Sequence, residues 1–151
     1  MKNQKVFFIC FSLILILPLM VFSQGKYLTT IFQEVNAIPE GKALVYVFRP
    51  SAFSGSAVHY TVKANDTAIC PIHLYNGSYM VYFAQPGILK VSAEVAKEQS
   101  AVMIEVKPGL TYFIKGTIRT GTWVGRPYLE EVSVDQGKKE IRKCKLLKDC
   151  F

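Results

Sequence analysis

The sequence predicts a mostly β fold: an antiparallel β-sandwich, transthyretin-like or immunoglobulin-like, followed by a short C-terminal helix. Short β-branched and aromatic runs recur from Ala43 onward, and turn residues separate them. From Asp135 the β pattern gives way to helix-favouring residues. Short connections favour antiparallel neighbours, and a single open sheet of seven or eight such strands would leave one apolar face in water.

The first 23 residues predict a secretory signal peptide. Lys2 and Lys5 form a basic start, residues 6–22 are almost wholly apolar, and Ser23 offers a small residue before a cut near Gln24. A retained membrane anchor is the alternative, because the apolar run approaches the length of a bilayer span. We expect a secreted or periplasmic mature chain of residues 24–151, which is enough for one hydrophobic core.

The basic residues are concentrated at the C-terminus. The formal net charge is +7. Cleavage of the predicted signal peptide would remove the two positive charges of Lys2 and Lys5. Residues 138–151 carry six basic and two acidic side chains. The rest of the chain is therefore nearly neutral and lacks the broad basic face that nucleic-acid binding needs.

Residues 24–42 form a lead-in that could be a short helix or an irregular cover, and Pro39-Glu40-Gly41 ends it. A sandwich domain over residues 43–134 follows. Turn pairs such as Asn65-Asp66 and Pro108-Gly109 separate its strands. The expected strands are Ala43–Arg49, Ala57–Ala64, Ala68–Leu74, Ser78–Ala84, Gly87–Val95, Ala101–Val106, Leu110–Thr117 and Tyr128–Val134.

Arg49 ends the first expected strand, on the same face as Val45 and Val47, and Pro50 forces the chain out of the sheet. Its guanidinium could bind carbonyls of the loop 51–56, or a carboxylate such as Glu130, and so hold the strand end. Capture of an anion is the alternative. We favour the structural role.

His59, Cys70 and His73 are the candidate metal ligands. A two-residue turn at Asn65-Asp66 would pair His59 with Ile72 and point His73 to the other face, although a slip at Pro71 would change this. We therefore expect no metal and no cofactor. The sequence also lacks a nucleophile elbow, a phosphate loop and a dinucleotide fingerprint, so no enzyme is predicted.

Three cysteines remain after cleavage: Cys70, Cys144 and Cys150. An odd number in an oxidising compartment allows at most one internal disulfide. A bridge from Cys70 to either tail cysteine would constrain the unfolded chain more than a Cys144–Cys150 bridge, because the loop it closes is longer. We expect a bridge between tail and body.

Residues 135–151 predict a basic amphipathic helix, weakened by Gly137. Its apolar face would carry Val134, Ile141, Cys144 and Leu147, and its basic face Lys138, Arg142 and Lys145. The apolar face could cover an open edge of the sandwich. Alternatively, the segment could dock on a membrane surface or a partner.

Aromatic residues beside turns are candidates for binding. Tyr75 precedes Asn76-Gly77, and Trp123 lies in the glycine-rich stretch 116–125. Rings on sandwich loops can stack on sugars or fill a partner's pocket, but they often close the ends of a core instead.

Three stretches resemble the bacterial family called domain of unknown function 2846. They read "GKALVYVFRP", "NDTAICPIHLYNGSYMVYFAQPGILKVSA" and "VKPGLTYFIKG". The resemblance implies a β-sandwich of the bacterial envelope with no established activity, although this chain lacks the lipid-anchoring cysteine of many members. The markers that we interpret as architectural are Arg49, Pro50, Gly77, Gly87 and Gly109. The expected function is a non-catalytic binding or accessory module whose partner is an envelope protein or a glycan.

Overall fold

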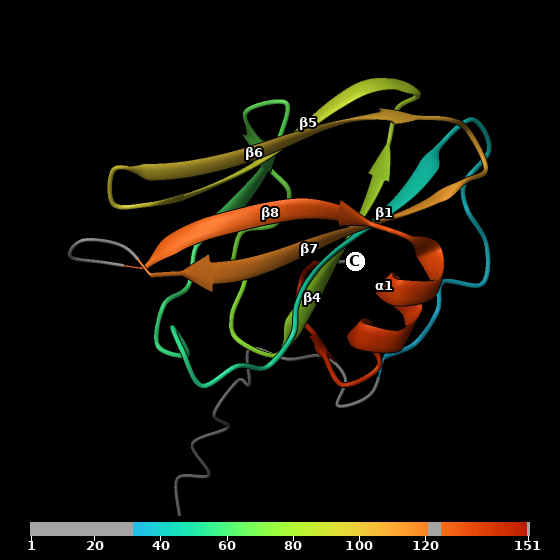
Figure 1. Cartoon of the computed structure of the whole chain (residues 1–151). Helices are drawn as coiled ribbons and strands as arrows, with labels where there is room; N and C mark the ends of the chain where they lie inside the picture. The colour runs from blue at the N-terminus through green and yellow to red at the C-terminus, as the bar shows by residue number, and fades with distance from the viewer. Residues whose placement is uncertain (1–31, 121–124, 151) are drawn as a thin grey trace, which may run out of the picture.

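The structure is a computed structural model that describes residues 32–120 and 125–150. The predicted signal peptide and Trp123 lie outside these residues. The described chain forms two β-sheets and one helix (Figure 1). The prediction of a mostly β, sandwich-like fold with one short helix near the C-terminus is confirmed.

The strands form one sheet of five and one of four. The order in the first is β8-β7-β1-β4-β9, and in the second β3-β2-β5-β6. The bounds are β1 Ala43–Arg49, β2 Thr61–Ala64, β3 Thr67–Ala68, β4 Ser78–Ala84, β5 Gly87–Val95, β6 Glu98–Val106, β7 Thr111–Arg119, β8 Arg126–Val132 and β9 Lys145–Leu146.

Two of the strand pairs are parallel, which the short turns did not predict. β1 pairs with β4 in antiparallel register but with β7 in parallel, and β9 lies parallel to β4. The chain leaves the five-stranded sheet after β4, builds β5 and β6 in the other sheet, and returns as β7 beside β1. Sequence-adjacent turns carry no information about such long-range neighbours.

The central strand of the five-stranded sheet is buried on both faces, since every residue of β1 is buried. Val45, Val47 and Ile114 pack between the two sheets. Tyr46, Phe48 and Phe113 point the other way, into a second apolar core. The molecule therefore has three layers, because the lead-in segment and the C-terminal tail cover the outer face of this sheet (Figure 1).

The described part of the lead-in is an irregular cover rather than a helix. Phe32 contacts Tyr46 and Tyr79 edge to face, with ring centroids 5.4 Å apart in both pairs. The Val35 amide donates a hydrogen bond to the Tyr46 hydroxyl at 2.8 Å. These contacts hold the segment against the second core.

The predicted C-terminal helix is shorter than expected. Helix α1 spans Val134–Ile141, and the Ser133 hydroxyl accepts a hydrogen bond from the Gln136 amide at its start. Cys144 and Leu147 lie beyond the helix, and Lys145 belongs to β9. Val134 is substantially exposed rather than on a buried face.

Gly137 is a packing residue rather than a weak point of the helix. It is buried in α1 directly over the ring of Phe113 in β7, and a Cβ atom at this position would overlap that ring. The glycine therefore lets the helix approach the sheet closely.

Two expected strands are also wrong in extent. Ala57–Ala64 shortens to β2, and Ala68–Leu74 survives only as the two residues of β3 and an isolated bridge between Tyr60 and Leu74. Pro71 lies in this irregular stretch and has no N–H for a ladder.

Candidate functional site

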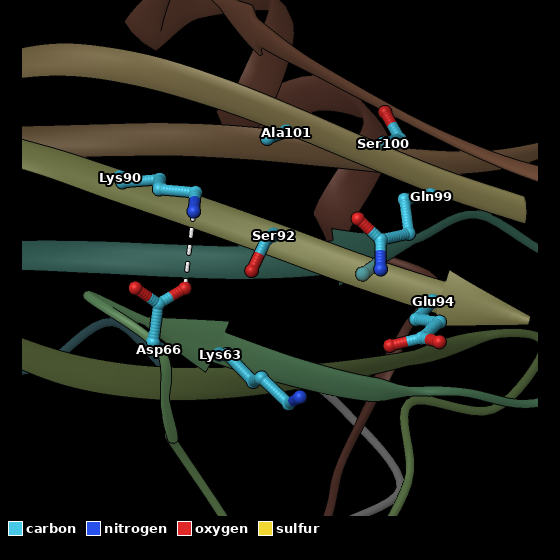
Figure 2. Close-up of a pocket in the computed structure, with 9 residues that line it drawn as sticks. Lys63, Asp66, Lys90, Ser92, Glu94, Gln99, Ser100 and Ala101 are labelled. Atoms are coloured by element: carbon cyan, nitrogen blue, oxygen red, sulfur yellow. Dashed lines mark hydrogen bonds and ion pairs between the residues drawn. The ribbon is translucent and has the colours of Figure 1, made fainter.

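A shallow hollow of about 330 Å³ lies on the outer face of the four-stranded sheet. Figure 2 shows the polar side chains of this face around it: Lys63, Asp66, Lys90, Ser92, Glu94 and Gln99. Ser100 also lines the hollow, but it pairs with the buried Ala93 and its hydroxyl accepts from the Leu129 amide. The centre is low because Ser92 pairs with Ala101 across β5 and β6, and both side chains are short. The strand register positions these groups, since residues of alternate parity point away from the core.

The polar groups around the hollow are of mixed charge. Lys90 forms an ion pair with Asp66 at 3.0 Å (Figure 2), and the Lys90 amide donates to the side chain of Asn65. Glu94 lies opposite Thr61 on one side and Gln99 on the other. The face can hydrogen-bond to a polar ligand without favouring a net charge of either sign.

His59, His73 and Tyr75 form a cluster of rings at one end of this sheet. The centroids of the two imidazoles are 5.0 Å apart, and His59 stacks on Tyr75 at 5.1 Å. The Nδ1 atom of His73 is 3.1 Å from the Thr61 hydroxyl. The expectation that the two histidines point to opposite faces is wrong.

The two histidines share a face because the hairpin register changes between the turn and His59. The turn at Asn65-Asp66 sets the pairs Ala64–Thr67 and Lys63–Ala68 as predicted, but Tyr60 then pairs with Leu74 rather than with Pro71, as an even ladder would require. Between these pairs the first strand advances three residues and the second advances six. An odd number of extra residues reverses the facing of every later side chain. The proline is the one sequence signal for this slip.

Arg49 is buried at the end of β1. Its guanidinium donates to the carbonyl oxygens of Val58 at 2.5 Å and Gly55 at 2.6 Å. It also lies over the ring of Tyr60, 5.8 Å from its centroid. Burial lowers the pKa of Arg49 from its usual value. The side chain thus joins the end of β1 to the following loop; Glu130 is not among its hydrogen-bond partners.

The other turn markers of the sequence gather near Arg49 or at strand ends. After Pro50 the chain is held by Asn76, whose side chain accepts from the Ala52 amide and donates to the Ala52 carbonyl, both at 3.0 Å. The adjacent Gly77 has a φ of 69°, which favours glycine. Gly87 and Gly109 also have positive φ values.

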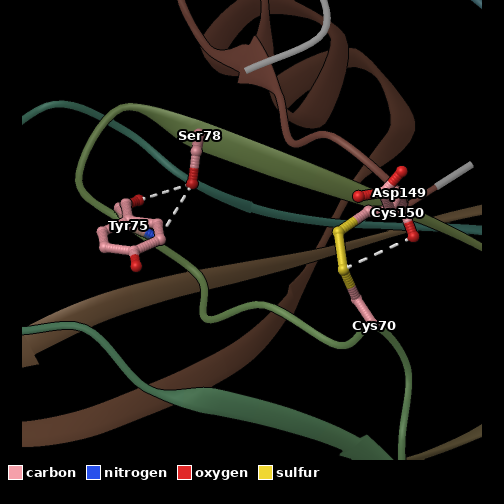
Figure 3. The surroundings of a disulfide bond; sticks show 5 residues. All are labelled: Cys70, Tyr75, Ser78, Asp149 and Cys150. Atoms are coloured by element: carbon pink, nitrogen blue, oxygen red, sulfur yellow. Dashed lines mark hydrogen bonds between the residues drawn. A yellow bond between two sulfur atoms is a disulfide. The ribbon is translucent and has the colours of Figure 1, made fainter. Parts of the chain in front are cut away.

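A disulfide joins Cys70 to Cys150, as the expected tail-to-body bridge (Figure 3). It links residues 80 positions apart. Cys144 is a free, buried cysteine whose thiol donates to the Arg49 carbonyl at 3.6 Å. Burial, reinforced by the charge of Glu140, raises the pKa of Cys144 to about 12.

The basic residues of the tail do not form one helical face. Lys138 lies on α1 and pairs with Glu34 of the lead-in at 2.7 Å, while Arg142 is exposed at the helix end and Lys145 lies in β9. Ile141, Cys144, Leu146 and Leu147 of the tail are buried. In the part of the chain that the structure describes, no helix has the length and apolarity to cross a bilayer.

Comparison with known proteins gives the family. No solved structure matches the chain. An uncharacterized protein of Haemophilus influenzae is 30% identical over 114 residues, which are 74% of this chain, and the match spans 64% of the length of that relative. Residues 39–126, which include Arg49, Pro50, Gly77, Gly87 and Gly109, match the family described as protein of unknown function (DUF2846). The chain belongs to this family.

Proposed function

We propose that this protein is a non-catalytic binding module of the bacterial envelope, and that it holds an envelope protein partner on the outer face of its four-stranded sheet. The observation that carries the proposal is the hollow over Ser92 and Ala101, ringed by polar groups of both charges. These groups are spread over exposed strands rather than gathered in a deep cleft, an arrangement suited to surface recognition.

The edges of the sandwich argue for recognition by side chains rather than by an added strand. The free edges of β6 and β8 lie beside one another, and the Leu129 amide donates to the Ser100 hydroxyl across them at 2.9 Å. This contact occupies part of the edge that a partner strand would need.

The disulfide is compatible with an extracellular or periplasmic location. Together with the signal peptide predicted over residues 1–23, it supports export to the envelope. N-terminal sequencing of exported protein should then begin near Gln24, and material beginning at Met1 would contradict cleavage.

The other binding hypotheses have less support. A membrane-surface helix needs an exposed apolar face, whereas Ile141 and Leu147 are buried. A sugar platform needs open ring faces, and Tyr75 is stacked on His59. Both observations therefore favour a protein partner over a membrane surface or a glycan.

The test is affinity capture from envelope extract with two matched variants. Ala101→Arg places a long charged side chain in the hollow at an exposed position, whereas Val134→Arg makes the same gain of charge on α1. We expect the wild type and Val134→Arg to retain the same protein, and Ala101→Arg to lose it. Retention by all three would show that this face is not the binding surface.

A further inference from the structure

We infer that His59 and His73 form a two-histidine site for a divalent transition-metal ion of the Zn²⁺, Cu²⁺ or Ni²⁺ type. The inference does not depend on the proposed protein partner. It rests on the convergence of two imidazoles, which the regular hairpin register would have kept apart.

The backbone fixes both histidines on the outside of the sheet. Tyr60 and Leu74 form a bridge, and both of their side chains are buried. Their neighbours therefore point outward: His59 faces Tyr75, and His73 faces Thr61. The two histidines are diagonal neighbours on that face, and both are exposed to solvent.

The hydrogen bonds place the proton on one nitrogen of His59 and allow the same tautomer in His73. His59 Nδ1 is 3.3 Å from the Ala57 carbonyl, which can only accept, so Nδ1 carries the proton. His73 Nδ1 can likewise donate to the Thr61 hydroxyl. In this tautomer each ring keeps an Nε2 lone pair. A ligating histidine typically donates its other ring N–H to such an oxygen, which fixes its tautomer and orientation.

The spacing of the rings fits one shared ion. With metal–nitrogen distances of about 2.0–2.1 Å, each ring centre lies roughly 3 Å from the ion, and a near-tetrahedral angle places the two centres roughly 5 Å apart. The observed separation is 5.0 Å, with the ring planes tilted by 52°. The stack of His59 on Tyr75 restrains one of the rings.

The donors also select the class of metal. Imidazole nitrogens suit Zn²⁺, Cu²⁺ and Ni²⁺, whereas Mg²⁺ and Ca²⁺ need oxygen ligands. Among the described residues, no group of three or more His, Cys, Asp or Glu side chains is placed to hold an ion. The remaining coordination positions would be filled by water, or by a group of a bound partner.

The test is titration of the purified protein, without a histidine tag, with Zn²⁺, Cu²⁺ and Ni²⁺ in a calorimeter. We expect one ion per chain and no binding of Mg²⁺ or Ca²⁺. His59→Gln and His73→Gln should each weaken binding at least tenfold, whereas Gln99→Ala, an exposed change on the same face, should not.

A second measurement needs no variant. In wild-type protein, nuclear magnetic resonance of the imidazole nitrogens should show the Nε2 signals of both histidines shifting together on addition of Zn²⁺. A shift at one histidine only would overturn the shared site. Binding unchanged in both glutamine variants would place the ion elsewhere, for example at the terminal amine, and no saturable binding would also overturn the proposal.

Discussion

Arg49 is the only charged side chain that is fully buried among the described residues. Its two charge-assisted hydrogen bonds to Gly55 and Val58 are the contacts that offset this burial. Arg49→Met keeps the apolar stem but leaves both carbonyls without that donor. We expect a loss of about 2–3 kcal/mol of unfolding free energy and a Tm lower by roughly 5–15 °C, measured by thermal denaturation.

The control for this change is Arg142→Met, because Arg142 is exposed at the end of α1. That variant should lie within about 0.5 kcal/mol of the wild type. Arg49→Met at wild-type stability would mean that packing alone holds the end of β1, since replacing a buried charge by an apolar side chain can be neutral.

Cys144 makes stability depend on alkaline pH. Its folded pKa is about 12, above its ordinary value of 9.0, so the folded state holds the thiol proton more tightly than the unfolded state does. This contribution is complete below pH 9 and is lost as the pH rises from 9 towards 12. In the Cys144→Ala variant, we expect the free energy of unfolding to fall less steeply with pH over this range than in the wild type. The slopes should differ by up to about 1 kcal/mol per pH unit, measured by urea unfolding.

Tyr60 also contributes to the fall of stability at alkaline pH, in the wild type and in the variant alike. Burial also raises its pKa, to about 12, and it is unchanged in the Cys144→Ala variant. The comparison therefore uses slopes rather than absolute stabilities, because the smaller side chain also leaves a cavity. Equal slopes in the two proteins would mean that Cys144 ionises as readily folded as unfolded.

At the level of elements, the contact between α1 and β7 depends on Gly137. Alanine has the higher helix propensity, by about 1 kcal/mol, so an isolated helix would gain from Gly137→Ala. Here the new methyl would overlap Phe113, and overpacking costs about 1–3 kcal/mol. We expect a net loss of up to about 2 kcal/mol of unfolding free energy in chemical denaturation.

A double-mutant cycle separates this overlap from other effects. Phe113→Leu removes the ring that the methyl would meet, so Gly137→Ala should cost less in that background than in the wild type. Lys139→Ala, on the exposed side of the same helix, serves as the control. A gain in stability from Gly137→Ala in the wild type would show that helix propensity outweighs the contact.

The elements that the sequence predicted well are those defined by local chemistry. β1, β4 and β5 have the expected bounds, because alternation and turn residues bracket each of them. In the tail, Ile141, Cys144 and Leu147 have helical spacing, but only Ile141 belongs to the helix. Ile141 ends the helix, whereas Cys144 and Leu147 point into different cores.

The site was less predictable than the fold. The face on which His73 lies depends on three extra residues in the irregular stretch around Pro71. Sequence periodicity does not predict how many residues such a stretch adds to one strand. The hollow depends on Ser92 lying opposite Ala101, which follows from the β5–β6 register rather than from either residue type. Long-range register is the information that local propensity lacks.

At the scale of the whole molecule, the tail is part of the fold rather than an appendage. The peptide after Gly137 supplies β9, half of the disulfide, and four buried side chains besides Cys150. They are Ile141, Cys144, Leu146 and Leu147. Loss of one large apolar side chain costs about 2–5 kcal/mol, and a domain has only about 5–15 kcal/mol in total.

We therefore expect a chain that ends at Gly137 to lose its cooperative thermal transition, observed by circular dichroism. Loss of the disulfide alone is the comparison: Cys70→Ala with Cys150→Ala should cost about 2–4 kcal/mol yet leave one cooperative transition. If the shortened chain melted like that double variant, the tail would contribute only its crosslink. Because the tail residues fill both cores, we expect it to be needed for the five-stranded sheet to fold.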